Sequence, residues 1–331
     1  MEKIKVSILI PVYNTSEYIE KCTHSILGQT YKNIEYIFVN DCSSDDSVDK
    51  LKEVLNQYPF RKKQIKIISH KVNMGLACSR NTAILAATGD YVLHVDSDDY
   101  IPLDAVDKLV NAASSTQADI VYGNCVGKYG LKNVNFPQND SSDVQSYLAN
   151  VLTRRCMVNI WGKLIRKNLY TEEMLLNKDD SFGEDYLTLP KLIAKSNIIH
   201  HLKETIYYYT LNRVGSYSEI LNRDKIIKIK KCEDSLKKWF LSQPYYLNYN
   251  LNTILELGSY YNKVGIIEHI DISDFVFVKQ LYPKSSSFQL LTKIPLKHFV
   301  VLILFDAHCW IVLKTLLQVK RAYNSFLNKN Y

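Results

Sequence analysis

The sequence predicts an α/β protein in which a mostly parallel β-sheet is flanked by helices and followed by a helical C-terminal region. Two observations carry this prediction. Through the first half of the chain, short β-branched apolar runs alternate with segments of helical periodicity, the order expected of a parallel sheet. From about residue 225 the chain becomes rich in Lys, Leu and Tyr, which is typical of helices. We expect one domain over residues 1–222 and a second, basic and mainly helical region over residues 223–331.

Five runs are predicted to form the strands of this sheet. The first is apolar apart from one serine and ends at Pro11, as expected of a buried strand. The five runs are residues 6–10, 34–39, 65–68, 91–95 and 120–122. Three consecutive tyrosines, Tyr207-Tyr208-Tyr209, predict a further strand later in the chain.

Helices are predicted between the strands. Asn14 is predicted to cap the first of them, with Glu17 three residues on reaching back to it. The second, over residues 45–55, has acidic residues at its positive end. The third spans residues 75–87, and Pro102 at a first helical turn opens the fourth.

Polar or turn-forming residues follow three of the predicted strands. These segments are Pro11-Val12-Tyr13, Asn40-Asp41 and Asp96-Ser97-Asp98-Asp99. Ligands of open α/β sheets bind outside the carboxyl ends of the strands, so the three segments predict a binding site.

The acidic cluster over residues 96–99 is the strongest local signal. Three carboxylates in four residues repel one another, and such a cluster is tolerated when a hard divalent cation neutralises it. A turn that leads into an acid-rich helix start is the alternative explanation. Asp41 could accept the imino hydrogen of a pyrimidine base, although an Asx-turn explains an isolated Asp at this place better.

Composition and missing motifs exclude several classes of protein. Apolar residues make up 47% and charged residues 23% of the chain, which rules out a wholly disordered protein. The seven cysteines are scattered without a Cys-x-x-Cys, so we expect reduced thiols rather than disulfides or a zinc site. No Gly-x-Gly-x-x-Gly, P-loop, Gly-x-Ser-x-Gly or His-Glu-x-x-His motif is present. Neither a plain membrane-spanning run nor a signal peptide is visible, and we expect a cytoplasmic protein.

An ordered set of motifs runs along the chain. The motifs are Val6-Ser7-Ile8-Leu9-Ile10-Pro11-Val12-Tyr13-Asn14, Asn40-Asp41-Cys42-Ser43-Ser44-Asp45, Asn73-Met74-Gly75 with Arg80-Asn81, Asp96-Ser97-Asp98-Asp99, Trp161-Gly162-Lys163 and Gly183-Glu184-Asp185, followed by Arg213 and Ser216. In this order they resemble glycosyltransferase family 2, whose members are inverting enzymes with the GT-A fold that use nucleotide-activated sugars. The resemblance is close over roughly residues 4–125.

This resemblance implies a binding site for a UDP-sugar donor. Pro11 and Tyr13 would flank the uracil ring, and Asp41 would accept its imino hydrogen. Asn73 and Arg80 would complete the pocket for the base and the phosphates.

The resemblance also implies a divalent metal ion, Mn²⁺ or Mg²⁺, on the diphosphate. Asp98 would ligate the ion, and Asp96 would approach either the ion or the ribose. Asp99 would bind sugar hydroxyls or hold the loop. Arg213 and Ser216 would lie in a loop that closes over the diphosphate.

The Glu-Asp pair is the predicted catalytic centre. An inverting transfer is a single displacement, so a carboxylate must take the acceptor's proton on the face opposite the leaving diphosphate. By resemblance this base is Asp185, and Glu184 would raise its basicity or bind an acceptor hydroxyl. The alternative is an ordinary acidic first turn of a helix. Trp161 and Lys163 would contact the acceptor, although a buried Trp with a snorkelling Lys explains them as well.

The C-terminal third carries the whole excess of positive charge. Residues 1–222 hold 25 basic and 26 acidic residues, whereas residues 223–331 hold 16 basic and 8 acidic residues. An apolar run, residues 299–305, lies there between lysines. An anionic partner such as a membrane surface would explain both features, and so would a solvated basic face with a core helix or a dimer contact.

We therefore expect a metal-dependent inverting glycosyltransferase, of the hexosyltransferase class, that moves a sugar from a UDP-sugar to a hydroxyl of a glycan, free or lipid-linked, in surface polysaccharide synthesis. Transfer to a lipid phosphate and a catalytically silent UDP-sugar-binding scaffold are the alternatives. We expect no nucleic-acid partner. A peripheral contact with the inner face of the cell membrane and a homo-oligomer are further expectations.

Overall fold

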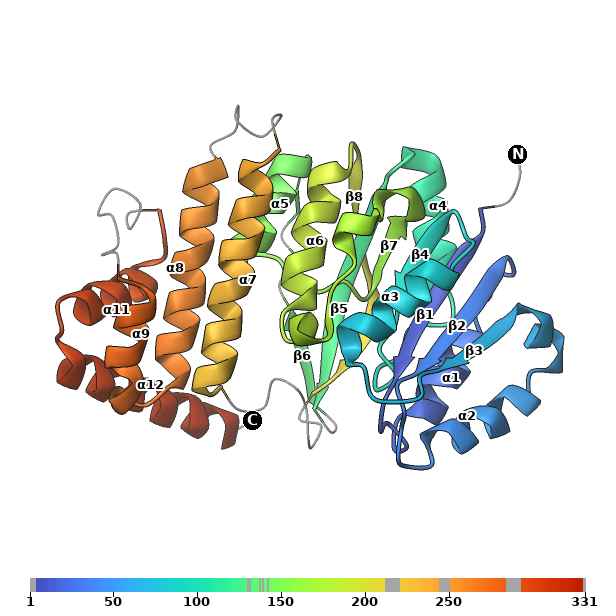
Figure 1. Cartoon of the computed structure of the whole chain (residues 1–331), viewed down its shortest axis with the longest axis horizontal. Coiled ribbons are helices and arrows are strands. Elements are labelled where there is room, and N and C mark those ends of the chain that lie inside the picture. Colours follow the sequence, from blue (N-terminus) through green and yellow to red (C-terminus); the bar gives the residue numbers. More distant parts are fainter. Residues whose placement is uncertain are drawn as a thin grey trace. The chain divides into compact units, whose positions relative to one another are not determined.

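The computed structural model describes residues 4–129, 132–136, 138, 140–141, 143–211, 221–243, 251–283 and 293–329 (Figure 1). The chain divides into two compact units. The first comprises Met1–Val151 and Arg155–Ser216, and the second comprises Leu152–Arg154 and Tyr217–Tyr331. Arg213 and Ser216, predicted to close over the diphosphate, lie outside the described residues.

The first unit is built on an eight-stranded sheet. The strand order is β3-β2-β1-β4-β7-β5-β6, and β8 pairs with β5. The strands are β1 (Val6–Val12), β2 (Ile34–Asn40), β3 (Ile65–Ser69), β4 (Tyr91–His94), β5 (Ile120–Tyr129), β6 (Lys132–Phe136), β7 (Lys163–Arg166) and β8 (Ile199–Thr210). All five predicted strands and the tyrosine strand are therefore present.

The sheet is mixed, with a parallel part that carries the predicted ligand-binding edge. Strands β1 to β4 pair in parallel, and β5 pairs in parallel with β8. Strand β7 runs antiparallel between β4 and β5, and β6 runs antiparallel to β5. Every residue of β1 is buried, because both faces of the sheet are covered.

In the described part of the first unit, six α-helices accompany the sheet. They are α1 (Ile19–Leu27), α2 (Ser47–Asn56), α3 (Leu76–Ala86), α4 (Ala105–Thr116), α5 (Val144–Leu152) and α6 (Glu184–Lys195). Two predicted helix starts are wrong. Helix α1 begins after Tyr18, and Asn14, at φ 48°, accepts a hydrogen bond from the Ser44 amide instead of capping the helix. Helix α4 begins at Ala105, three residues after Pro102.

The second unit is helical in its described part. Its α-helices are α7 (Arg223–Leu241), α8 (Leu251–His269), α9 (Phe275–Leu281), α11 (Leu296–Asp306) and α12 (Trp310–Lys329), and α7 and α8 lie side by side (Figure 1). Their core contains Ile226, Val264, Phe275, Leu302 and Phe305. None of the helices, over the part of the chain that the structure describes, is long and apolar enough to cross a membrane.

Candidate active site

The predicted site residues gather at the carboxyl edge of the parallel strands. Asp41 follows β2, and the acidic cluster over residues 96–99 follows β4. Because β1 pairs in parallel with both strands, their carboxyl ends lie at the same edge. Helix α3 brings Arg80 to the site, and the first turn of α6 brings Asp185 to it.

Asp41 organises the loop between β3 and α3. Its Oδ1 atom lies 2.7 Å from His70 Nδ1 and accepts a 2.8 Å hydrogen bond from the Met74 amide. Its Oδ2 atom accepts a 2.7 Å bond from the Gly75 amide. Asn73 Nδ2 donates to the main-chain oxygen of Asp41. The carboxylate therefore fixes the loop, and Oδ2 keeps acceptor capacity.

Gly75 is required at the turn into α3. Its φ is +86°, and a Cβ atom there would lie 2.6 Å from Ser181 Oγ. His70 is a site residue that was not predicted, although it directly follows β3 and the rule about strand ends applies to it as well. On the same edge, Pro11 is buried within β1 and the Tyr13 side chain is 45% exposed.

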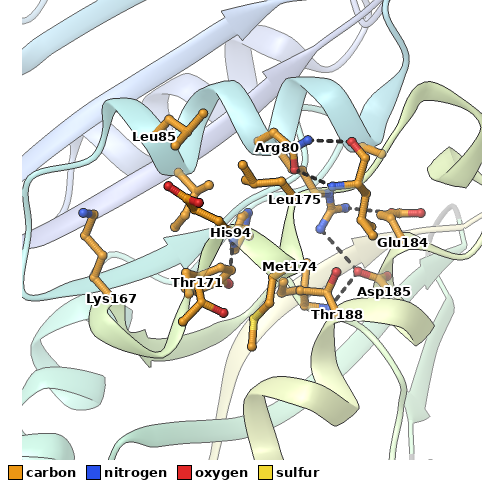
Figure 2. Close-up of a pocket in the computed structure, with 17 residues that line it drawn as sticks. Arg80, Leu85, His94, Lys167, Thr171, Met174, Leu175, Glu184, Asp185 and Thr188 are labelled. Carbon is orange, nitrogen blue, oxygen red and sulfur yellow. Dashed lines mark hydrogen bonds and ion pairs between the residues drawn. The ribbon is translucent and has the colours of Figure 1, made fainter. Parts of the chain in front are cut away.

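Arg80 joins the two acidic segments. Its guanidinium group lies 3.0 Å from Asp96 Oδ1. It also lies 3.3 Å from Asp185 Oδ1 and 3.5 Å from Glu184 Oε1 (Figure 2). Burial alone would lower the pKa of Arg80, but the three carboxylates outweigh it and raise the pKa further. A fixed buried cation therefore links the end of β4 to the start of α6.

The Glu-Asp pair forms the first turn of α6, as the sequence predicts. Glu184 is buried, and both burial and the negative charge of Asp185 raise its pKa to about 8. The Asp185 side chain is 23% exposed. Besides Arg80, its Oδ1 atom accepts a 3.0 Å bond from the Ile160 amide, which comes from the segment before β7.

The acidic cluster after β4 is divided between buried and accessible carboxylates. Asp99 is buried and accepts bonds from the Tyr207 hydroxyl at 2.8 Å and the Thr210 amide at 2.7 Å. Burial and the charges of Asp98 and Asp96 raise the pKa of Asp99 well above its usual range. The side chains of Asp96 and Asp98 are only partly buried.

The accessible part of this cluster suits a hard metal ion. Magnesium and manganese take oxygen ligands and are commonly held by one or two carboxylates together with substrate phosphates. Asp96 and Asp98 offer such a donor set. No group of three or more His, Cys, Asp or Glu side chains is placed to hold an ion by itself among the described residues.

Trp161 and Lys163 are buried beside the site. The Trp161 ring stacks on Tyr207 with a centroid distance of 4.3 Å and on Tyr209 with 5.3 Å. Lys163 is 2% exposed and donates to the main-chain oxygen of Asn159 at 2.6 Å. Burial lowers the pKa of Lys163 to about 8. Contact of these residues and of Asp99 with an acceptor stays a prediction.

A pocket of about 180 Å³ borders the ion-pair cluster (Figure 2). Its walls come from α3, from His94 and Ile160, from residues between Lys167 and Leu176, and from the first turns of α6. Arg80, Glu184 and Asp185 line one end of it.

Comparisons with known proteins agree with this architecture. The family model described as Glycosyl transferase family 2 matches residues 7–173, about half of the chain. Glycosyltransferase GlyA of Streptococcus pneumoniae is 32% identical over 65% of this chain, which spans 32% of that relative. The cholesterol galactosyltransferase of Borreliella burgdorferi is 28% identical, over 90% of this chain and 92% of the relative.

Among solved structures, residues 1–349 of S. aureus TarS in complex with UDP-GlcNAc share the fold. The TM-score is 0.73 at 18% identity, and the match covers 96% of this chain and 92% of that chain. The matched family and the shared fold, on a sheet whose carboxyl edge gathers the family's motifs, show that the chain belongs to glycosyl transferase family 2 and is a glycosyltransferase with the GT-A fold.

Proposed function

We propose that the protein transfers a hexose or N-acetylhexosamine from a UDP-sugar to an acceptor hydroxyl, with inversion, in the assembly of a surface glycan. One observation carries the proposal. Arg80 forms ion pairs with Asp96 after β4 and with Asp185 at the start of α6. The carboxylate proposed to bind the donor and the carboxylate proposed to act as the base therefore lie at the same edge of the sheet. The complex of the fold neighbour with UDP-GlcNAc and the sterol acceptor in the name of a relative support a UDP-sugar donor and a hydroxyl acceptor.

The donor would lie across the ends of β1, β2 and β4. Pro11 and Tyr13 would flank the uracil ring, and Asp41 Oδ2, with its remaining acceptor capacity, would take the imino hydrogen. Asn73 and Arg80 would border the base and the phosphates. Arg213 and Ser216 are proposed to cover the diphosphate.

Asp98, together with Asp96, would hold a Mn²⁺ or Mg²⁺ ion. When bound, such an ion supplies Lewis-acid stabilisation of the departing diphosphate. The side chains of Asp96 and Asp98 are partly exposed and could reach such an ion. The Asp99 carboxylate instead accepts hydrogen bonds from Tyr207 and Thr210.

Asp185 would act as the general base. The acceptor oxygen forms a bond to the anomeric carbon, the bond from that carbon to the diphosphate oxygen breaks, and UDP leaves with the electron pair. The acceptor proton passes to Asp185. The Ile160 amide and Arg80 hold the orientation of this carboxylate, and the raised pKa of the neighbouring Glu184 favours the neutral form of Glu184 beside it. The buried Trp161, Lys163 and Asp99 would support the walls of this site.

A second proposal concerns location. The protein would work at the cytoplasmic side of the cell membrane and touch its inner face through the second unit. Helices α11 and α12 each carry an exposed apolar stripe in that unit, and basic side chains accompany the stripes. A homo-oligomer stays a prediction.

Thermal unfolding in the presence of nucleotide sugars tests the donor class. A ligand at about 100 times its Kd stabilises a protein by about 2.7 kcal/mol, which is readily seen as a raised Tm. We expect UDP and at least one UDP-sugar to raise the Tm in the presence of Mn²⁺ more than in its absence, and GDP-sugars to have little effect. Protection by no UDP-sugar contradicts the proposal, and protection without any transfer to glycan or lipid acceptors favours a binding scaffold.

A further inference from the structure

The pocket behind Arg80 has two chemically different ends. Glu184 and Asp185 lie at one end of the lining residues, and Leu85 and Lys167 lie at the other (Figure 2). The lining also includes aliphatic side chains, namely Ile84, Ile160, Met174, Leu175 and Leu176, together with the polar side chains of Asn81, Thr171, Glu172 and Thr188. The pocket thus combines a polar catalytic end with a group of aliphatic side chains in its walls.

The polar end disfavours an anionic acceptor. Arg80 already pairs with Asp96, Glu184 and Asp185, so its single positive charge is shared among several carboxyl groups. A phosphate group on the acceptor would meet the negative charge of Asp185 and would compete with the donor diphosphate for Arg80. A neutral hydroxyl can instead donate a hydrogen bond to the carboxylate of Asp185.

The walls favour an aliphatic body over a sugar ring. Among the described residues that line the pocket, Tyr170 is the one Phe, Tyr or Trp, and its hydroxyl lies 3.0 Å from His94 Nε2. Leu85 is 69% exposed although it lies on a helix that packs against the sheet. Aliphatic walls with an exposed leucine at the mouth suit the burial of alkyl or alicyclic surface.

We propose that this pocket binds the apolar part of the acceptor, an aliphatic or alicyclic alcohol whose hydroxyl reaches Asp185. The inference rests on the proposed function for the role of Asp185 as base. It adds the chemical class of the acceptor and assigns Leu85 and Met174 as specificity residues for its apolar body.

A series of primary alcohols from ethanol to 1-octanol tests the pocket directly. Each buried methylene strengthens binding by about fourfold, so the Kd measured by calorimetry is expected to fall steadily with chain length in the wild type. Met174→Trp fills the pocket and Leu85→Glu places a charge at its mouth. Both variants should flatten this trend, with at least about a tenfold loss for 1-octanol.

Matched measurements separate failure of the pocket from failure of the proposed function. Leu103→Glu changes a leucine that is 56% exposed and does not line the pocket, so it should keep the wild-type trend. UDP affinity, measured for every variant, reports the donor site alone. Because Leu85 is exposed, Leu85→Glu decides the matter if Met174→Trp does not fold.

Two results would overturn the inference. One is the absence of a chain-length trend in a wild-type protein that binds UDP, which leaves the proposed function standing. The other is an equal trend in the wild type, Met174→Trp and Leu85→Glu, which places the alkyl chain elsewhere. If the wild-type protein does not bind UDP, the proposed function is contradicted. The alcohol series would still show whether the pocket binds an alkyl chain.

Discussion

Asp185 is the residue on which the proposed chemistry depends. Asp185→Asn keeps the size of the side chain and can still accept from the Ile160 amide, but it cannot take a proton. We expect near-normal affinity for the UDP-sugar and a fall in kcat of at least about a hundredfold, the low end for general-base catalysis. Steady-state kinetics across pH checks this. Equal activity of both proteins at every pH would move the base elsewhere, with Glu184 next, or favour a phosphate acceptor that needs no base.

Asp98 is the residue that tests the metal site. Its side chain is partly exposed, and its negative charge lies close to those of Asp96 and Asp99, so removing the Asp98 carboxylate relieves like-charge repulsion and should cost little stability. Asp98→Ala is expected to abolish the Mn²⁺-dependent part of UDP binding, measured by calorimetry with and without the ion. Asp104→Ala, which removes an exposed carboxylate after the same strand, is the control and should bind as the wild type does. Unchanged metal dependence in Asp98→Ala would refute the assignment.

Glu184 gives the stability of the protein a dependence on pH. Burial and Asp185 raise its pKa to about 8, whereas a Glu in the unfolded chain titrates near its ordinary value of 4.5. Between these values the unfolded state releases a proton that the folded state keeps, so stability falls as pH rises.

Glu184→Gln removes this contribution. We expect the wild type to lose at least about 1 kcal/mol more stability than the variant between about pH 5 and pH 8, measured by urea unfolding, since one pKa unit corresponds to about 1.4 kcal/mol. Glu233, whose pKa burial raises to about 7, adds a similar slope to both proteins and cancels in the comparison. Parallel stability curves for the two proteins would contradict the raised pKa.

How far the site could be predicted from sequence differs from residue to residue. Asp41 and the cluster at 96–99 could be predicted from the sequence, because polar residues directly after an apolar strand form a local pattern. Tyr207 is different. Its hydroxyl donates to Asp99, and the Asp96 amide donates to it, across more than a hundred residues of chain. Such a contact depends on the pairing of β5 with β8, for which a single sequence carries no local signal.

At the scale of elements, strand β7 is likewise a feature that could not be predicted from the sequence. The strands of the βαβ order were predictable from their apolar periodicity, whereas β7 has only four residues and one of them is a lysine. It is nevertheless inserted between β4 and β5 and sets the segment with Ile160 and Trp161 beside the site. The wrong prediction for the start of α1 has a local cause. Asn14 adopts a left-handed conformation that bonds the neighbouring loop, so its side chain is not available as a cap.

Gly162 tests whether entry into β7 shapes the site. Its φ is +67°, and a Cβ atom would lie 3.0 Å from Tyr207 Cδ2. Gly162→Ala should therefore cost about 1–2 kcal/mol from the backbone conformation alone, and it should weaken UDP binding by displacing the tyrosine that holds Asp99. Gly265→Ala, in α8 with no atom near the added carbon, should stabilise by about 0.5–1 kcal/mol. Urea unfolding measures the stability of both variants, and titration with UDP measures their affinity. If Gly162→Ala changes neither quantity, the entry into β7 tolerates repacking.

At the scale of the whole molecule, the second unit combines two faces on the same helices. Buried Leu302, Phe305 and Leu313 belong to its core. Exposed apolar residues at spacings of four and three form a second stripe on each helix, Leu296, Val300 and Ile303 on α11 and Val312, Leu316 and Val319 on α12. The apolar run over residues 299–305, for which the sequence allowed either a core or a surface role, therefore contributes side chains to the core and to the exposed stripe. Deleting this run would remove part of the core.

The charges beside these stripes favour an anionic surface over a second copy of the chain. Within residues 293–320 Asp306 is the one acidic residue, and it pairs with Lys263 and Lys279. Two such faces brought together would bring lysines against lysines. A membrane with anionic lipids offers apolar depth and opposite charge, and each lysine near it contributes about 1 kcal/mol.

Substitutions on the exposed stripe test this contact without disturbing the core. Leu316→Glu combined with Val312→Glu is expected to release the protein from anionic vesicles, and wild-type binding should fall steeply as salt screens the lysines. Val276→Glu changes an exposed valine on α9 of the same unit and should leave vesicle binding and UDP binding intact. Vesicle flotation at two salt concentrations measures the effect. If the double variant still floats, the stripe is not the contact, and if it instead converts a dimer into a monomer, the stripe is an interface between two copies.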